Sequence, residues 1–255
     1  TEFGGNYAKY VDYLWEILSA NRNSLQLFDM LHSMRQFDDL TYVHSVNVAL
    51  IASILGQWLK FSEKDIRILT ISGLLHDIGK IMIPNEILTK PGKLTVAEYN
   101  IMKQHVNFGY EKVKNQNIDI RIKEACLLHH EKCDGTGYPF GLKSDHIPAV
   151  AKIIAIADVY DAMTSARVYR GALCPFEVID TMYKDAFTKF EPEYILPFLK
   201  NVASSYINND VRLSDGRIGK VVLINENALS LPIVQCEDEF IDLSKTRGLT
   251  VSAIL

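Results

Sequence analysis

The chain is poor in cysteine, and none of its cysteines are spaced as a metal-binding or redox pair. Its 255 residues include four cysteines, Cys126, Cys133, Cys174 and Cys236, with no CxxC motif among them. Disulfide-stabilised secreted domains are usually dense in paired cysteines, whereas cytoplasmic proteins keep their thiols reduced. We therefore interpret each cysteine as a small buried or loop residue and expect a cytoplasmic location.

Long apolar runs and targeting signals are also lacking. No uninterrupted apolar run reaches the length of about 18 residues that a membrane-spanning helix needs. No basic and apolar leader with a small-residue cleavage site opens the sequence. We therefore expect neither a membrane span nor a signal peptide.

The chain has no excess of basic residues. Its formal net charge is -4, whereas a protein that binds nucleic acid polymers usually carries a basic face. We therefore expect no nucleic acid polymer as a partner, although local charge could still hold a small anionic ligand. With 48% hydrophobic and 23% charged residues, the chain is long and apolar enough to bury a large core.

Most of the chain has the periodicity of helices. Asp38, Asp39 and Thr41 offer N-caps for a helix that runs to about Leu59. Ser62 opens the next helix, and Thr95 with Glu98 forms a capping box that predicts a helix through His105. Apolar spacing predicts further helices over Tyr7–Leu18, Ser24–Met34, Phe108–Lys114, Ile118–His130, Ala149–Ala166, Pro175–Phe190 and Glu193–Tyr206.

The pattern changes after Asn208, where short β-branched segments replace helical spacing. The stretch "VRLSDGRIGKVVLI" predicts a hairpin, and "LPIVQC", "EFIDL" and "LTVSAIL" predict further strands. We therefore expect a mainly α protein with three parts. Residues 1–36 form a helical segment that packs on the core or links to another domain, 37–208 the catalytic domain, and 209–255 a small β appendage.

Histidines and aspartates interrupt the apolar helices. A single histidine on an apolar face is usually structural, and we interpret His32 and His146 in that way. Five other histidines and two aspartates gather near apolar positions of separate helices, where an ionised carboxylate is costly unless it is paired or binds a metal. This set is His44, His76, Asp77, His105, His129, His130 and Asp158.

Seven nitrogen and oxygen donors without a thiolate suit iron, manganese, nickel, cobalt or zinc. They are too many for one metal that also leaves room for a substrate, but they suit two metals bridged by one carboxylate. Two metals a few ångströms apart can bind a bridging hydroxide and clamp a phosphate for in-line attack. The donor set therefore predicts phosphoester hydrolysis.

Four motifs in order strengthen this hypothesis. They are "HDIGK", "IPNEILTKPGKLT", "HHEKCDGTGYP" and "ADVYDAMTSARVYR". Together they resemble the HD superfamily of metal-dependent phosphohydrolases and, more narrowly, its HD-GYP family of bacterial cyclic di-GMP phosphodiesterases. The resemblance covers roughly residues 38–206. It implies an HD-superfamily helical bundle around a metal centre, with iron as the first choice of metal.

The resemblance also assigns roles to residues. One metal would be bound by His44, His76 and Asp158, and the other by His105, His129 and His130. Asp77 would bridge the two, so that Asp77 and Lys80 are the expected catalytic residues. The expected substrate contacts are Lys80, Tyr138, Arg167 and Arg170. Members with a third metal carry a glutamate one helical turn before the first histidine, and Leu40 stands there, which predicts two metals.

Several alternatives stay open on the sequence. The expected reaction converts cyclic di-GMP to linear pGpG, with GMP after a second round. The alternatives are another cyclic dinucleotide or nucleotide as substrate, or a receptor that binds the dinucleotide, turns it over weakly and signals by protein contact. The resemblance is also compatible with a homodimer or a sensory-domain partner. Glu131 could orient a histidine ring or be a solvated charge at a helix end.

Overall fold

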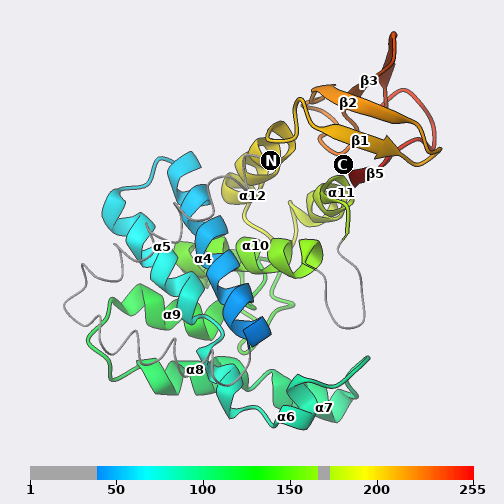
Figure 1. Ribbon diagram of the computed structural model, residues 1–255. Helices are drawn as coiled ribbons and strands as arrows, with labels where there is room; N and C mark the ends of the chain where they lie inside the picture. The colour runs from blue at the N-terminus through cyan, green and yellow to red at the C-terminus, as the bar shows by residue number, and fades with distance from the viewer. Residues whose placement is uncertain (1–38, 166–172) are drawn as a thin grey trace. The chain divides into compact units, whose positions relative to one another are not determined.

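The computed structural model describes residues 39–165 and 173–255 (Figure 1). The chain divides into two compact units, Thr1–Ala162 and Met163–Leu255. The three-part division expected from the sequence stays a prediction. Several expectations lie outside the described residues, namely the helices Tyr7–Leu18 and Ser24–Met34, the structural interpretation of His32, and the contacts of Arg167 and Arg170.

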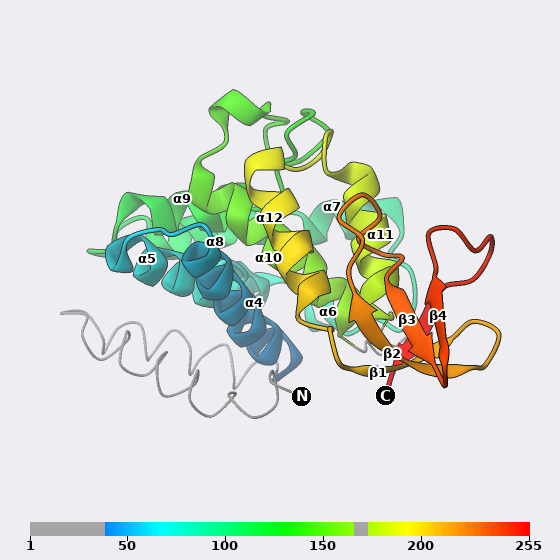
Figure 2. The ribbon, with the colours of Figure 1, turned by 90° about the horizontal axis from the view of Figure 1, so that it is seen from above.

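The first unit begins with two long helices, α4 (Asp39–Trp58) and α5 (Glu63–Leu75), which lie side by side (Figures 1 and 2). The Ser62 hydroxyl accepts the backbone N–H of Asp65, as expected for an N-cap. Among the described helices, Leu40–Trp58 alone is long and apolar enough to span a membrane, but half of it is buried inside the protein. We therefore interpret α4 as a core helix.

A turn-rich segment follows α5. It contains the 3-10 helix η1 (Ile78–Met82), the single turn α6 (Asn85–Leu88) and α7 (Val96–Met102). The predicted capping box at the start of α7 is confirmed, with reciprocal bonds between Thr95 and Glu98. Lys90 adds an ion pair to the Glu98 carboxylate at 2.7 Å, so that the preceding loop is tied to the helix.

The helix that was predicted to continue through His105 is broken. α7 ends at Met102, and α8 (His105–Val113) starts as a separate helix. The Gln104 N–H bonds to the Ile101 carbonyl, which is a tighter turn than an α-helix makes. The Met102 carbonyl instead accepts a hydrogen bond from Nδ1 of the His105 ring at 2.8 Å. The break therefore places His105 at the first position of α8.

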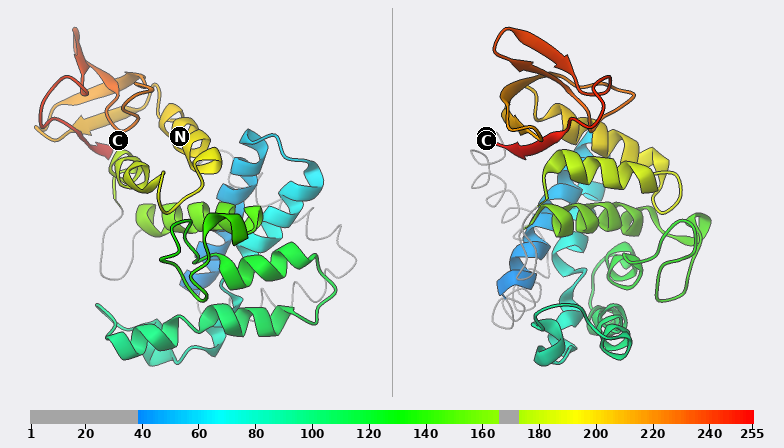
Figure 3. Two further views of the ribbon diagram at one scale, coloured as in Figure 1. Left: turned by 180° about the vertical axis from the view of Figure 1, so that it is seen from behind. Right: turned by 90° about the vertical axis from the view of Figure 1, so that its right-hand side faces the viewer.

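The rest of the first unit comprises α9 (Ile120–Leu128), η2 (Ser144–His146) and most of α10 (Ala149–Thr164). α8 and α9 lie side by side, and α9 also contacts α5 (Figure 3). α9 and α10 match the predicted helices but are shorter. α9 ends at Leu128, before His129, and α10 ends at Thr164. α10 is apolar on nearly every face and is buried, with Asp158 and Asp161 as its buried charged residues.

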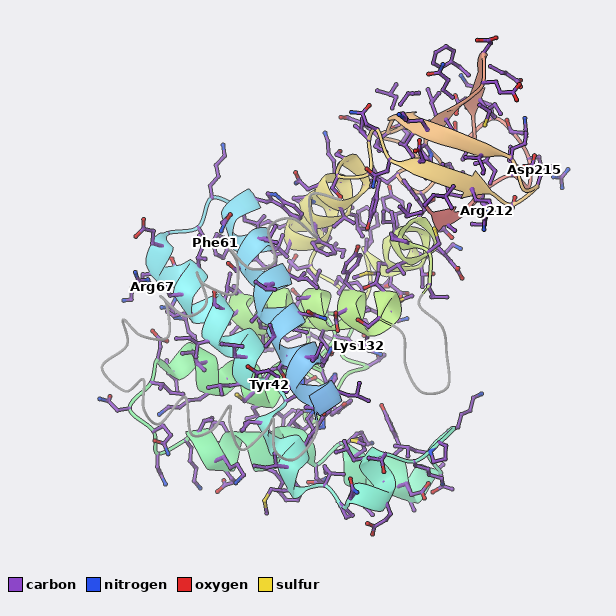
Figure 4. All side chains as sticks on the ribbon, viewed as in Figure 1. Tyr42, Phe61, Arg67, Lys132, Arg212 and Asp215 are labelled. Carbon is purple, nitrogen blue, oxygen red and sulfur yellow. The ribbon has the colours of Figure 1, made fainter. Side chains whose placement is uncertain are left out.

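The second unit holds α11 (Pro175–Asp185), α12 (Pro192–Ser204) and a five-stranded antiparallel sheet. The strands are β1 (Asp210–Leu213), β2 (Ile218–Leu223), β3 (Ile233–Cys236), β4 (Glu239–Asp242) and β5 (Val251–Ile254), in the order β4-β3-β2-β1-β5. Figure 4 shows Arg212 on β1 and Asp215 in the turn that follows. The predicted hairpin and the three further strands are therefore confirmed.

Candidate metal centre

Seven side chains from separate segments meet inside the first unit. α4, the α5–η1 junction, α8, the end of α9 and α10 each contribute to this cluster. Its members are the seven donors singled out in the sequence, His44, His76, Asp77, His105, His129, His130 and Asp158. Helices that each present donors from one end or one face to a shared interior are typical of metal centres in helical bundles.

Asp77 lies at the middle of the cluster, and its two oxygens face different histidines. Oδ2 is 3.3 Å from Nε2 of His76 and 3.7 Å from Nε2 of His44. Oδ1 is 3.4 Å from Nε2 of His105 and 3.9 Å from Nε2 of His129. Asp77 therefore belongs to two donor groups, one with His44 and His76 and the other with His105, His129 and His130.

Backbone carbonyls fix the orientation of three rings. Nδ1 of His76 donates to the Gly73 carbonyl at 2.7 Å. Nδ1 of His105 donates to the Met102 carbonyl and Nδ1 of His129 to the Ala125 carbonyl, at 2.8 and 3.0 Å. Because a carbonyl can only accept, Nδ1 carries the proton and Nε2 turns a lone pair toward the cluster.

Two polar atoms of the cluster are buried without a hydrogen bond from any described residue, Nε2 of His76 and Oδ1 of Asp77. A buried acceptor without a partner costs roughly 1–3 kcal/mol, so such atoms need an explanation. Their lone pairs point into a group of imidazole and carboxylate donors. The cluster therefore fits divalent metal binding.

His44 is held between two carboxylates of α10. Its Nε2 lies 3.0 Å from Oδ1 of Asp158, and its Nδ1 lies 2.6 Å from Oδ2 of Asp161. Asn47 donates to the other oxygen of Asp161 at 2.9 Å. Burial alone would lower the pKa of His44, but the bonds to Asp158 and Asp161 outweigh it and raise that pKa to about 9.

The charges of the cluster are arranged around neutral imidazoles. Burial lowers the pKa of His105, takes that of His129 well below its usual value and lowers that of His130 to about 3. Burial would raise the pKa of Asp77, but the positive charge of Lys80, with the contact to His76, holds it well below its usual value. His105, His129 and His130, as neutral imidazoles beside ionised carboxylates, are in the protonation state that binds a metal, whereas His44 would release a proton on binding one.

Lys80 lies on η1, one turn after the pair His76-Asp77. Its ammonium group is 2.5 Å from Oδ2 of Asp77, and its side chain is 19% exposed. The cluster thus has a cation that contacts its central carboxylate and remains partly open to solvent.

The loop after His130 folds back over the end of α9. The Tyr138 N–H bonds to the His130 carbonyl at 3.2 Å, and the Tyr138 ring stacks on the His130 ring with centroids 4.7 Å apart. A Cβ added to Gly137 would lie 2.4 Å from both Glu131 Cα and Lys132 N, so only glycine fits at this position. The Asp134 carboxylate accepts the Thr136 N–H at 2.9 Å, which stabilises a turn within this loop.

Glu131 has neither of the roles considered for it in the sequence. It is buried, at 4% exposure, so it is not a solvated charge. Its hydrogen bonds run to the backbone of the loop rather than to a histidine ring. Oε1 accepts the N–H groups of Phe140 and Gly141 at 2.7 and 3.1 Å, and Oε2 accepts the N–H of Leu142 at 2.8 Å. Glu131 therefore anchors the loop that carries Tyr138.

Asp161 and Asn47 are further residues of the site that the sequence did not single out. The one available signal was that Asp161 lies three residues after Asp158 on a helix that is otherwise apolar, and residues three apart share a helix face. Leu40, at the position of the third-metal glutamate, is 64% exposed, and His146 lies exposed next to Asp145.

Relatives with similar sequences are phosphodiesterases of cyclic dinucleotides. The chain is 36% identical over 203 residues to the cyclic di-GMP phosphodiesterase PA4108 of Pseudomonas aeruginosa, which covers 79% of this chain and 49% of the relative. It is 40% identical over 145 residues to the 3'3'-cGAMP-specific phosphodiesterase 1 of Vibrio cholerae. That alignment covers 56% of this chain and 33% of the relative. The chain thus spans half or less of the length of these relatives.

A solved structure with the same fold is the HD domain of the Listeria monocytogenes phosphodiesterase PgpH in complex with cyclic-di-AMP. It superposes with a TM-score of 0.54 over 69% of this chain and 95% of that domain, at 18% identity. This similarity identifies the fold and agrees with the expected helical bundle. The family model for the HD domain matches residues 23–194, about two thirds of the sequence. By that match, this chain belongs to the HD-domain family.

Proposed function

We propose that this protein is a metal-dependent phosphodiesterase that hydrolyses cyclic di-GMP to linear pGpG and, in a second round, to GMP. The observation that carries the proposal is the position of Asp77, whose two oxygens face separate groups of histidines. Relatives named as cyclic di-GMP phosphodiesterases, at 36% and 41% identity, support the substrate. The proposal concerns the region that the chain shares with them.

In the proposed centre, His44, His76 and Asp158 would hold one divalent metal, and His105, His129 and His130 would hold a second. Asp77, which belongs to both donor groups, would contribute to both. When bound, such a metal pair supplies an activated water and neutralises phosphate charge. Imidazole and carboxylate ligands bind iron, manganese, nickel, cobalt and zinc. Iron is our first choice among these metals, and the other four are alternatives.

The residues of the chain have separate tasks in this proposal. The reaction consumes one water, breaks the bond between phosphorus and the 3' oxygen, and leaves the phosphate on the 5' oxygen of pGpG. Lys80 contributes positive charge beside the phosphate, and its ammonium already contacts Asp77. Tyr138 faces the substrate from the loop above His130. Arg167 and Arg170 remain proposed substrate contacts.

A second candidate substrate is 3'3'-cGAMP, because the chain is 40% identical to a Vibrio cholerae enzyme named for that dinucleotide. A cytoplasmic location is part of the proposal, since the four cysteines are free thiols. A homodimer or a sensory-domain partner fits it as well.

The proposal is tested with Asp77→Ala, which removes the shared carboxylate. Protein purified without oxygen should contain divalent metal and convert cyclic di-GMP to pGpG. Asp77→Ala should lose most of its bound metal and most of its phosphodiesterase activity. Asp145→Ala is the matched control, because the same change removes a carboxylate that is 75% exposed. Full metal content and turnover in Asp77→Ala would show that the site is misassigned. Tight binding of cyclic di-GMP by metal-replete protein without turnover would instead identify a receptor.

A further inference from the structure

Two tyrosines and a lysine form an aromatic group with one cation at the edge of the metal centre. Tyr99 belongs to α7 and Lys103 is the C-cap of that helix, four residues later, so both side chains lie on one face. The Lys103 ammonium is 5.3 Å from the centre of the Tyr99 ring and 5.9 Å from that of Tyr138. The two tyrosine rings meet edge to face, with centroids 6.5 Å apart.

This group adjoins the proposed metal ligands through direct contacts. Tyr138 stacks on His130 and lies 6.5 Å from the His105 ring. α7 leads into the same ligands, because the Met102 carbonyl accepts Nδ1–H of His105. The distance between Tyr99 and the centre is therefore set by one short helix and one turn. A ligand whose phosphate occupies the centre can reach the Tyr99 ring with a group attached to that phosphate.

The group is also available to a ligand. Tyr99 is 48% exposed, so a ligand can reach its ring. Within residues 39–165 and 173–255, Lys103 forms no ion pair with a carboxylate, whereas Lys80, Lys90 and Lys114 each have one. An ammonium that contacts aromatic rings alone keeps its capacity to donate hydrogen bonds to an acceptor on a ligand.

The chemistry of this group matches one nucleobase better than the other. Any base can stack on a tyrosine ring. Guanine presents two adjacent acceptors, O6 and N7, to a lysine ammonium, whereas adenine places an amino donor beside its N7. We propose that Tyr99 and Lys103 form a guanine-recognition subsite next to the metal centre. This inference rests on the proposed function, because it places the phosphodiester of the same ligand at the centre.

The test compares Lys103→Met and Tyr99→Leu with the unmodified protein, all loaded with manganese. The substrates are cyclic di-GMP, cyclic di-AMP and bis(p-nitrophenyl) phosphate, a diester without a base. For Lys103→Met, the ratio of kcat/KM for cyclic di-GMP to that for the base-free diester should fall about tenfold, mainly through KM. For Tyr99→Leu the ratio should fall for both dinucleotides, because stacking does not distinguish the bases.

Lys112→Met is the matched control, since Lys112 lies on α8 two turns beyond His105 and should leave the ratios unchanged. An unaltered ratio in Lys103→Met would overturn the subsite. An equal fall for all three substrates together with lost metal would also overturn it, because that pattern indicates a structural role for the α7 face.

Direct binding separates a failed subsite from a failed function. Titration of the same proteins with cyclic di-GMP and cyclic di-AMP needs no turnover. The unmodified protein could bind cyclic di-GMP more tightly than cyclic di-AMP without cleaving either. If Lys103→Met then binds the two dinucleotides equally, the subsite is supported and the proposed hydrolysis is wrong. If the unmodified protein binds neither dinucleotide, both proposals are wrong.

Discussion

The Tyr138 ring stacks on the His130 ring at an interplanar angle of 28°. Tyr138 belongs to the loop that we propose contacts the substrate, and His130 to the proposed metal ligands. Their contact couples the two, and it is maintained by hydrogen bonds from the loop to the end of α9. A change in how the loop is anchored should therefore be felt at the metal centre.

The anchor is the Glu131 carboxylate, and Glu131→Gln tests it. Glutamine loses the charge and one of the two acceptor oxygens that serve Phe140, Gly141 and Leu142. Because bonds to a buried charged group contribute about 1.5–3 kcal/mol, the free energy of unfolding should fall by roughly that amount. Denaturant unfolding measures this loss, and hydrogen exchange should show faster exchange of the three loop amides.

Glu124→Gln on α9 is the control for Glu131→Gln, because it makes the same change at a partly exposed site. Wild-type protection of the loop amides in Glu131→Gln would show that the loop is held by other contacts.

Five of the seven donors in the cluster were predictable because they belong to motifs with fixed residue types and order, and His44 and His105 were predictable from their places near apolar helix positions. The residues that support them were not, because their partners lie far away in the sequence. Asp161 bonds to His44 across 117 residues, and Glu131 binds backbone groups, which leave no trace in residue types. The break before His105 was missed for a similar reason. The Met102 carbonyl bonds to the His105 side chain there, in place of a backbone N–H of the helix. Hydrophobic periodicity indicates which residues are buried, but it does not show where a side chain replaces a backbone group as hydrogen-bond partner.

Asp161 should set the orientation of His44, because its carboxylate accepts the Nδ1 proton at 2.6 Å. In Asp161→Asn the side chain has one acceptor oxygen in place of two. His44 and Asn47, which each bond to a separate oxygen of Asp161, would then have to share that oxygen, or one of them would lose its hydrogen bond. Removing such a supporting carboxylate typically lowers metal affinity about 10–100-fold. Competition with a metal-sensitive dye measures the affinity.

Circular dichroism should show that Asp161→Asn keeps its helices, and Asp145→Asn serves as the exposed control. A metal affinity within the error of wild type would mean that His44 is oriented by packing alone.

Two glycines at the contact between η1 and α8 should respond in opposite ways to alanine. A Cβ at Gly79 would lie 1.9 Å from the His105 carbonyl oxygen and 2.4 Å from the Gly109 nitrogen, so the two segments would have to separate. A Cβ at Gly109 would lie 3.4 Å from its nearest neighbour, the Gly79 nitrogen. Gly79→Ala should therefore destabilise by about 1–3 kcal/mol or more and weaken metal binding.

Gly109→Ala is the matched partner of Gly79→Ala and should be neutral or slightly stabilising, because alanine favours the helix by up to about 1 kcal/mol over glycine. Thermal unfolding of both variants gives the comparison. The reverse order of stability would contradict the close approach of η1 to α8.

The ion pair at the start of α7 should make the stability of this helix depend on pH. Hydrogen bonds from Lys90 and from Thr95 lower the pKa of Glu98 from 4.5 to about 2. Because the folded-state pKa is the lower one, the contribution of Glu98 is fully present above pH 4.5 and is lost as the pH falls through about 2. Glu98→Gln resembles the protonated form, so it should lower the Tm at pH 6 and lose that effect near pH 2.

Lys90→Met provides the control for this pH dependence, because the Lys90 bond is the largest cause of the shift. In a protein that already carries Lys90→Met, the further change Glu98→Gln should lower the Tm at pH 6 by a smaller amount. A Tm difference between wild type and Glu98→Gln that stays constant from pH 6 to pH 2 would show that the capping box acts without the charge of Glu98.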